Sequence, residues 1–192
     1  EEHIYPVVTP LAVDSGHPFP FLTNHTINAI VGIFQIQPDG TKDYKIAILP
    51  IPSVLDRIIE IPSRGNKEHR FVYLEDVITY YANQFFQGYG IEDYMVFRIT
   101  RDADLEIDEE EATDLLSEVE ASLRRRRRGD AVRLEVCGEV KDNLLDFVLT
   151  SVELEPKDVY RIDGHLDCRM YFNFCNYPGL DQLRYVPFEP KL

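Results

Sequence analysis

Arginine is the residue of this sequence with the clearest chemical potential, and it is concentrated in two places. The first is an unbroken run of five side chains: Arg124, Arg125, Arg126, Arg127 and Arg128. The second is the pair Arg98 and Arg101, which Asp102 and Asp104 follow. A guanidinium group binds phosphate oxygens in pairs, and a phosphate polymer offers many such oxygens. Both places are therefore candidate polyanion-binding sites.

Each place also has a structural interpretation, and the sequence favours it. The arginine run ends a predicted helix, where positive charge opposes the helix macrodipole favourably and Gly129 suits the C-cap. Beside Arg98 and Arg101, acidic residues would repel a phosphate unless Mg²⁺ or specific ion pairs compensated their charge. Because side chains alternate along a strand, Arg98 and Arg101 are expected on opposite faces. We therefore expect a helix end at the run and an ion-pair network around Arg98 and Arg101.

No side chain is predicted to be catalytic or to bind a metal. The five histidines lack the spacing of a metal site: His3, His17, His25, His69 and His165. The sequence contains no Gly-x-x-x-x-Gly-Lys-Ser/Thr phosphate loop, no Gly-x-Gly-x-x-Gly pattern and no Gly-x-Ser-x-Gly elbow. The acidic residues from Asp104 to Glu111 lack the glycine and the spacing of an EF-hand loop. We expect no cofactor in this segment and any phosphate-transfer chemistry elsewhere.

Composition is typical of a soluble globular protein. The chain carries 20 Lys and Arg against 34 Asp and Glu, which gives a net charge of −14 at pH 7. This balance argues against a nucleic-acid partner, because affinity for a duplex depends on a basic surface that neutralises phosphates. No apolar run approaches the ~20 residues that span a bilayer, and no signal-peptide pattern is present.

The cysteine pattern favours a reducing, cytoplasmic setting. The chain has three cysteines without the close pairs of a zinc site: Cys137, Cys168 and Cys175. Each is expected to be a small apolar residue that packs in the interior.

The hydrophobic pattern predicts strands interleaved with helices. Two β-branched runs at 27–36 and 44–51 flank Asp39-Gly40, a combination typical of a hairpin. Shorter strands are predicted at 58–61, 71–74, 94–100, 131–136 and 159–162. Helices are predicted at 75–86, from Asp108 to the arginine run, at 141–152 and at 166–174. The order of these elements predicts an α+β fold with a mixed sheet and packed helices.

Three of the predicted helices have a distinct buried face. In the first, the buried side chains are predicted to be Val77, Ile78, Tyr81 and Phe85. In the second, Asp108 and Glu111 resemble a capping box, and the stripe is Ala112, Leu115, Leu116, Val119 and Leu123. In the third, the inward side chains are Leu144, Leu145, Val148 and Leu149. Residues 1–22, with four prolines, are predicted to be an extended N-terminal arm, residues 63–69 a mobile loop and residues 177–192 a linker.

Four segments of the chain resemble the middle, or head, domain of bacterial polyphosphate kinases. The first two are PVVTPLAVDSGHPFPF at 6–21 and RFVYLEDVI at 70–78. The third begins FRITRDADLEIDEEE at Phe97 and continues through the arginine run to Val136, and the fourth is DVYRIDG at 158–164. These segments occur in the family's order, so the resemblance covers nearly all of the chain.

The resemblance implies a multidomain enzyme that moves the terminal phosphate of ATP onto polyphosphate, with Mg²⁺ and through a phosphorylated histidine. It places that histidine and most nucleotide contacts in later domains, and a small helical domain before this one. Residues 1–192 would then be a single middle domain without catalytic residues, which supports homo-oligomer assembly and shapes access to the phosphate-transfer tunnel. The implied fold is similar to that of phosphohistidine phosphatases. The implied location is cytoplasmic, with peripheral membrane contact of the parent enzyme left open.

Two alternatives from other functional classes are kept at this point. A free-standing polyanion-binding module would need only the arginine run, and it would bind polyphosphate in a salt-dependent way. A small histidine-dependent phosphatase would need one indispensable histidine, and none of the five is visibly placed for that task.

Overall fold

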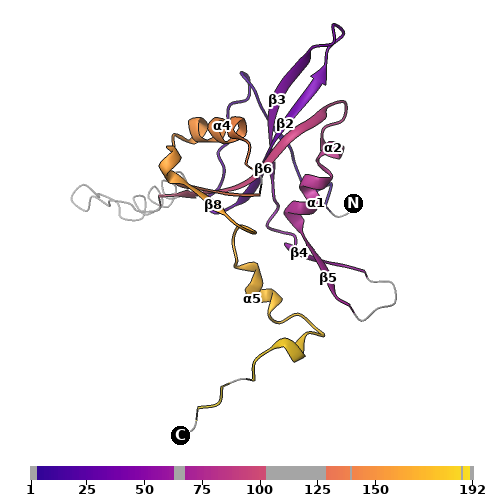
Figure 1. Cartoon of the computed structure of the whole chain (residues 1–192), viewed down its shortest axis with the longest axis vertical. Coiled ribbons are helices and arrows are strands. Elements are labelled where there is room, and N and C mark those ends of the chain that lie inside the picture. Colours follow the sequence, from indigo (N-terminus) through magenta and orange to yellow (C-terminus); the bar gives the residue numbers. More distant parts are fainter. Residues whose placement is uncertain (1–3, 63–67, 103–128, 139, 187, 191–192) are drawn as a thin grey trace, which may run out of the picture.

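Six strands form the main sheet of the protein, whose computed structural model describes residues 4–62, 68–102, 129–138, 140–186 and 188–190. The strands are β1 (Leu11–Val13), β2 (Ile27–Ile36), β3 (Lys42–Pro50), β6 (Gly90–Arg101), β7 (Ala131–Cys137) and β8 (Val159–Ile162). Their order across the sheet is β1-β3-β2-β6-β7-β8 (Figure 1). Neighbours run antiparallel except β7 and β8, which are parallel. The predicted α+β fold with a mixed sheet is confirmed.

A tight hairpin joins β2 to β3, as the sequence predicts. The Gln37 amide donates to the Thr41 carbonyl over 2.8 Å, and Asp39 Oδ1 accepts hydrogen bonds from the amide and hydroxyl of Thr41. Gly40 has a φ of +83°, a left-handed conformation that glycine adopts without strain. The chemistry of this turn fixes the register between the two strands.

Helices cover both faces of the sheet. Helices α1 (Leu74–Tyr80) and α2 (Ala82–Phe85) pack on one face, which we call the α1 face. Helix α4 (Asp142–Val152) packs on the other, the α4 face (Figure 1). Because side chains alternate along a strand, successive residues of β6 enter different cores. Val96 packs in the core of the α1 face, whereas Phe97 packs in the core of the α4 face.

The helix predicted at 75–86 is present but divided, and its buried face differs from the prediction. Tyr81 separates α1 from α2, and its φ of −99° and ψ of 19° depart from regular helix geometry. The prediction is correct for Ile78, which is buried, and wrong for Tyr81, which is 40% exposed. The side chain buried at that level is Ala82. A tyrosine can keep its hydroxyl in water, and the small alanine lets the helix approach the sheet closely.

Helix α4 agrees with the prediction in position and in its inner face. All four predicted side chains are buried: Leu144, Leu145, Val148 and Leu149. The helix is the crossover between the parallel strands β7 and β8. It ends at Glu153, which adopts a left-handed conformation with a φ of 58° and a ψ of 38°. A left-handed residue at this position is usually glycine.

We expect Glu153→Gly to raise the free energy of unfolding by about 0.5 to 1 kcal/mol, because relief of the left-handed strain outweighs the entropy that glycine adds to the unfolded chain. Chemical denaturation would report the change as a higher midpoint at constant slope. The matched control is Glu155→Gly, at a residue with a φ of −103° that gains nothing from glycine and should lose stability. A fall in stability for Glu153→Gly would contradict the strain argument.

A second, two-stranded sheet lies beside the main one. It pairs β4 (Ile58–Ile61) with β5 (Arg70–Tyr73), at the positions where the sequence predicts short strands. Helix α5 (Met170–Phe174) begins the segment that extends away from the main sheet in Figure 1. Two short 3₁₀ helices, η1 (Pro156–Asp158) and η2 (Asp181–Leu183), complete the elements of the described residues.

An aromatic cluster joins the C-terminal segment to the two-stranded sheet. The ring of Phe71 on β5 meets the rings of Phe174 and Tyr177 edge-on, with centroids 4.9 Å apart in both pairs. The Tyr177 hydroxyl donates to the Glu60 carboxylate on β4, and His69 Nδ1 lies 2.7 Å from the same carboxylate. These contacts hold the start of the predicted linker against β4 and β5.

The helix predicted at 166–174 is shorter than expected. Only α5 forms, and residues 164–169, which we call the crossing segment, run from β8 over the α1 face instead. Leu166 in this segment is 2% exposed and belongs to the core of the α1 face. Asp167 has a φ of 58°, which is incompatible with a helix. Burial of Leu166, rather than local helix propensity, therefore determines the path of the crossing segment.

Several predictions fall outside the described residues. These are the helix from Asp108, its cap and buried stripe, the arginine run and residues 63–67 of the predicted loop. Within the predicted N-terminal arm, β1 joins the edge of the main sheet, and Val8 and Leu22 are buried.

The cysteines divide between interior and surface. Cys137 packs against the core of the α1 face, and burial raises the pKa of its thiol, as expected of a packing residue. Cys168 and Cys175 are exposed, so the prediction that they pack in the interior is wrong. Both come after Leu166, the last buried residue of the described C-terminal part, beyond which the chain runs along the surface.

Candidate functional site

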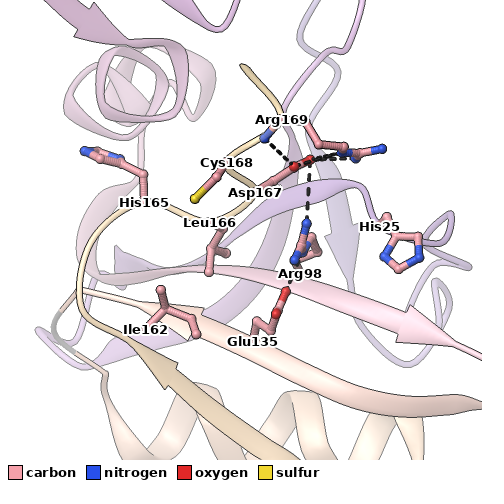
Figure 2. Close-up of a pocket in the computed structure, with 9 residues that line it drawn as sticks. All are labelled: His25, Arg98, Glu135, Ile162, His165, Leu166, Asp167, Cys168 and Arg169. Atoms are coloured by element: carbon pink, nitrogen blue, oxygen red, sulfur yellow. Dashed lines mark hydrogen bonds and ion pairs between the residues drawn. The ribbon is translucent and has the colours of Figure 1, made fainter. Parts of the chain in front are cut away.

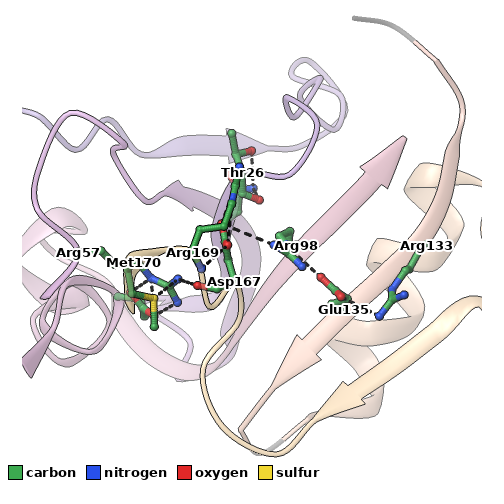
Figure 3. Close-up of polar contacts among 10 residues, drawn as sticks. Thr26, Arg57, Arg98, Arg133, Glu135, Asp167, Arg169 and Met170 are labelled. Atoms are coloured by element: carbon green, nitrogen blue, oxygen red, sulfur yellow. Dashed lines mark hydrogen bonds and ion pairs between the residues drawn. The ribbon is translucent and has the colours of Figure 1, made fainter. Parts of the chain in front are cut away.

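A network of charged side chains lies on the α1 face. Strand β6 supplies Arg98, β7 supplies Arg133 and Glu135, and the crossing segment supplies Asp167 and Arg169 (Figure 3). Strand alternation explains why Arg98 and Glu135 lie on the α1 face, because the residues before and after each of them pack in the core of the α4 face. Arg98 and Glu135 are also direct cross-strand partners in the antiparallel pair. Opposite charges at such positions attract each other.

Glu135 is held between two arginines. Arg98 Nε donates to Glu135 Oε2, and Arg133 Nη2 lies 2.8 Å from Glu135 Oε1. The Glu135 side chain is only 8% exposed. A buried carboxylate needs paired charge and hydrogen bonds to offset its lost hydration, and the two guanidinium groups provide both. Their arrangement also fixes Arg98 in place.

Asp167 binds the other side of Arg98 and the exposed Arg169. Asp167 Oδ2 lies 3.6 Å from Arg98 Nη1 and 2.6 Å from Arg169 Nη2. Arg169 also donates from Nε and from its own amide to Asp167 Oδ1, over 2.8 and 3.1 Å. The hydrogen bonds from Arg169 lower the pKa of Asp167 to about 2. This carboxylate is therefore fully ionised near neutral pH.

A cavity of about 470 Å³ opens beside these groups (Figure 2). Among its lining side chains are His25, Arg98, Glu135, Asp167 and Arg169. In Figure 2, Arg98 lies between Glu135 and Asp167, while the ring of His25 lies on the opposite side of the cavity from the His165 ring. The cavity is therefore open and charged, and the guanidinium groups of Arg98 and Arg169 lie on either side of the Asp167 carboxylate.

A buried ion pair lies next to the cavity, beneath the crossing segment. Glu75, in the first turn of α1, is 2% exposed, and both of its oxygens accept hydrogen bonds from Arg57 Nε over 3.1 and 3.0 Å. Arg57 Nη1 also donates to the Asp167 carbonyl over 2.7 Å. His165 Nδ1 lies 3.5 Å from Glu75 Oε1, and its ring stacks on Tyr73 with centroids 3.4 Å apart. Arg57 thus connects α1 to the crossing segment.

Sequence comparison decides the family. The profile described as the polyphosphate kinase middle domain matches residues 1–174. The chain belongs to this family. The predicted resemblance is therefore confirmed, and this assignment favours the predicted main function over a free-standing polyanion-binding module or a small phosphatase.

Individual relatives of this polyphosphate kinase middle domain agree with the assignment. The polyphosphate kinase of Halalkalibacterium halodurans is 42% identical over 197 residues, which cover 100% of this chain and 28% of that protein. The polyphosphate kinase of Pseudomonas putida is 35% identical over 192 residues, covering 100% of this chain and 26% of that protein. The chain therefore spans about a quarter of the length of these relatives.

A solved structure shares the fold of this middle domain. The crystal structure of the polyphosphate kinase from Porphyromonas gingivalis superposes with a TM-score of 0.74 and 22% identity. The superposition covers 100% of this chain and 26% of the other. The sheet and helices described above are thus also the architecture of that segment.

The two candidate polyanion-binding arginines that the structure describes, Arg98 and Arg101, lie on opposite faces of the sheet. Arg98 pairs with Glu135 and Asp167, two residues that the sequence analysis did not name as its partners. Arg101 lies on the α4 face, as predicted from alternation, where it donates to the carbonyls of Leu22 and Gly129 over 3.0 Å and lies over the Phe21 ring. The arginine run lies outside the described residues, so its prediction stays untested.

Sequence reasoning missed six charged residues of the network and of the neighbouring buried pair: Arg57, Glu75, Arg133, Glu135, Asp167 and Arg169. One signal was available, because Glu75 interrupts an otherwise apolar helix face between Leu74 and Ile78. A carboxylate at such a position needs a buried partner. Nothing local identifies that partner, since Arg57 and Asp167 are distant in sequence.

The described residues of the middle domain offer neither a metal site nor a membrane-spanning helix. In this part of the chain, no group of three or more His, Cys, Asp or Glu side chains could hold a metal ion. No helix in the same residues is long and apolar enough to cross a membrane.

Proposed function

We propose that this chain is the middle domain of a polyphosphate kinase, which transfers the terminal phosphate of ATP to polyphosphate through a phosphohistidine. The observation that carries the proposal is the family match over residues 1–174. ATP and Mg²⁺ would bind to parts of the parent enzyme outside this chain. The parent would be a cytoplasmic phosphoprotein, and this segment would contribute to a homo-oligomer.

Within that enzyme, the role proposed for residues 1–192 is structural. The charged groups of the α1 face are largely engaged with one another, and these contacts hold the crossing segment on the sheet. The segment in turn sets the point at which the following residues leave the sheet. A domain that fixes the path of its chain in this way is suited to orient its neighbours and to shape access to a phosphate-transfer tunnel.

We expect the 192-residue chain to make no polyphosphate when it is incubated with labelled ATP and Mg²⁺. The reason is that its sequence contains no phosphate loop and no recognisable phosphorylatable centre. The assay measures acid-stable polymer and protein-bound phosphohistidine, with the full-length parent as the positive control. Polymer synthesis by the 192-residue chain alone, or failure of the full-length parent to make polymer, would refute the proposed division of labour.

A further inference from the structure

Asp167 occupies the position of an anion bound between two arginines. Its Oδ2 atom is shared by Arg98 and Arg169, and it lies at the edge of the cavity of about 470 Å³ (Figure 2). Guanidinium groups that converge on one oxyanion are the usual arrangement for phosphate recognition. In this structure the anion is a carboxylate of the chain itself.

We propose that this cavity binds an oligophosphate, whose phosphoryl oxygens displace the Asp167 carboxylate from Arg98 and Arg169. Asp167 would then be an internal competitor that keeps the site closed until a more highly charged anion arrives. The choice of an oligophosphate as ligand rests on the proposed function, whereas the site itself rests on the geometry.

The two arginines differ in a way that suits capture of a ligand. Arg98 is 17% exposed and is fixed by Glu135, so one half of the site is already in position. Arg169 is 70% exposed, and the only ion pair found for it among the described residues is with Asp167. Its side chain can therefore move with an incoming anion. A preorganised half and a movable half lower the ordering cost of binding without blocking access.

The Asp167 carboxylate is a weaker ligand for the two guanidinium groups than an oligophosphate. It offers a single negative charge, whereas an oligophosphate offers several adjacent oxyanions that can engage both guanidinium groups in pairs. The cavity volume of about 470 Å³ lies in the range of small-molecule sites, roughly 300 to 1,000 Å³.

Local charge favours the exchange despite the net charge of −14 on the whole chain. When the Asp167 side chain rotates away, Arg98 and Arg169 lose the carboxylate that they share, while Glu135 stays neutralised by Arg98 and Arg133. At physiological ionic strength, interactions between exposed charges are screened over about 8 Å. Groups at the cavity therefore outweigh the distant acidic residues.

The test is a calorimetric titration of the 192-residue chain with tripolyphosphate. Asp167→Asn removes the competing charge but keeps a residue that tolerates the left-handed backbone, and it should bind about tenfold more tightly than the unaltered chain, the scale of one charge-assisted hydrogen bond. Arg169→Gln should lose most of the binding. Arg70→Gln is the matched control, since Arg70 is 66% exposed and pairs with Glu68 elsewhere on the surface. It should bind like the unaltered chain.

A second readout locates the ligand. The Nε–Hε resonance of Arg98 should shift when tripolyphosphate saturates the site, and circular dichroism should show that every variant is folded. Equal affinity for Asp167→Asn and the unaltered chain, an equal loss for Arg70→Gln and Arg169→Gln, or an unchanged Arg98 resonance would each overturn the proposal.

Two further arms separate the outcomes. Titration with ATP in place of tripolyphosphate distinguishes a nucleotide from the polymer. Tighter ATP binding by Asp167→Asn would identify the ligand as a nucleoside triphosphate, whereas unchanged ATP binding would identify it as polyphosphate. Activity of the full-length parent is measured independently. If the parent makes polyphosphate but Asp167→Asn does not change tripolyphosphate binding, the proposed site is wrong and the proposed function stands. If the parent makes no polyphosphate but the 192-residue chain binds tripolyphosphate tightly, the proposed function is wrong and the site stands.

Discussion

Replacement of Glu75 by alanine is expected to lower the free energy of unfolding by about 3 to 5 kcal/mol. The substitution leaves the Arg57 guanidinium, which is 14% exposed, without its carboxylate in the interior of the protein. That charge has lost most of its hydration, and without Glu75 it keeps the neutral Asp167 carbonyl as a partner but no opposite charge. Urea denaturation followed by circular dichroism would measure the loss as a lower midpoint at constant slope.

Two comparisons isolate the buried pair as the cause. Glu68→Ala removes a carboxylate that is 61% exposed and pairs with Arg70, so it should cost at most about 1 kcal/mol. The double variant Arg57→Met with Glu75→Leu removes both charges and should recover most of the loss, because well-packed apolar residues commonly replace a buried pair without penalty. An equal cost for Glu75→Ala and Glu68→Ala would show that the Arg57 interaction contributes little.

Local patterns are enough to predict the elements whose structure depends on near neighbours. The β2–β3 hairpin follows from Asp39 and Gly40, because a left-handed residue is needed at the turn. Helix α4 follows from the spacing of Leu144 and Val148, which places them on one face over a single turn. The opposite placement of Arg98 and Arg101 follows from strand alternation in the same way.

Contacts between distant residues could not be predicted from such patterns. Arg57 and Asp167 are 110 positions apart, and only the folded chain shows that the crossing segment brings them together. The same cause explains the shortened helix at 166–174. Leu166 has an apolar site on the α1 face to fill, and that burial outweighs the local preference for helix.

Glu75 shows how far local sequence patterns reach, because they identify the buried carboxylate but not the residue that pairs with it. The sequence shows Glu75 within an apolar stripe, which identifies a residue that needs a partner. It does not say whether that partner is a side chain, a metal or a ligand. Geometry supplies the answer, because Arg57 engages both oxygens of the carboxylate.

Leu134→Ala is expected to cost about 2 to 5 kcal/mol of unfolding free energy. Leu134 is 0% exposed at the centre of β7, where it is the cross-strand partner of Ile99 and packs in the core beneath α4. Removal of its side chain loses the transfer free energy of the buried carbons and leaves a cavity. The control is Val132→Ala, two residues earlier on the same strand and 47% exposed, which should cost less than about 1 kcal/mol.

The size of the loss will show how the α4 face responds to a cavity. A value near 2 kcal/mol means that surrounding side chains move into the space, whereas a value near 5 kcal/mol means that the cavity stays open. The second outcome is favoured, because β7 is fixed on both sides by β6 and β8 and cannot close the gap by moving. Equal losses for Leu134→Ala and Val132→Ala would contradict this, since they would show that burial in this core does not determine stability.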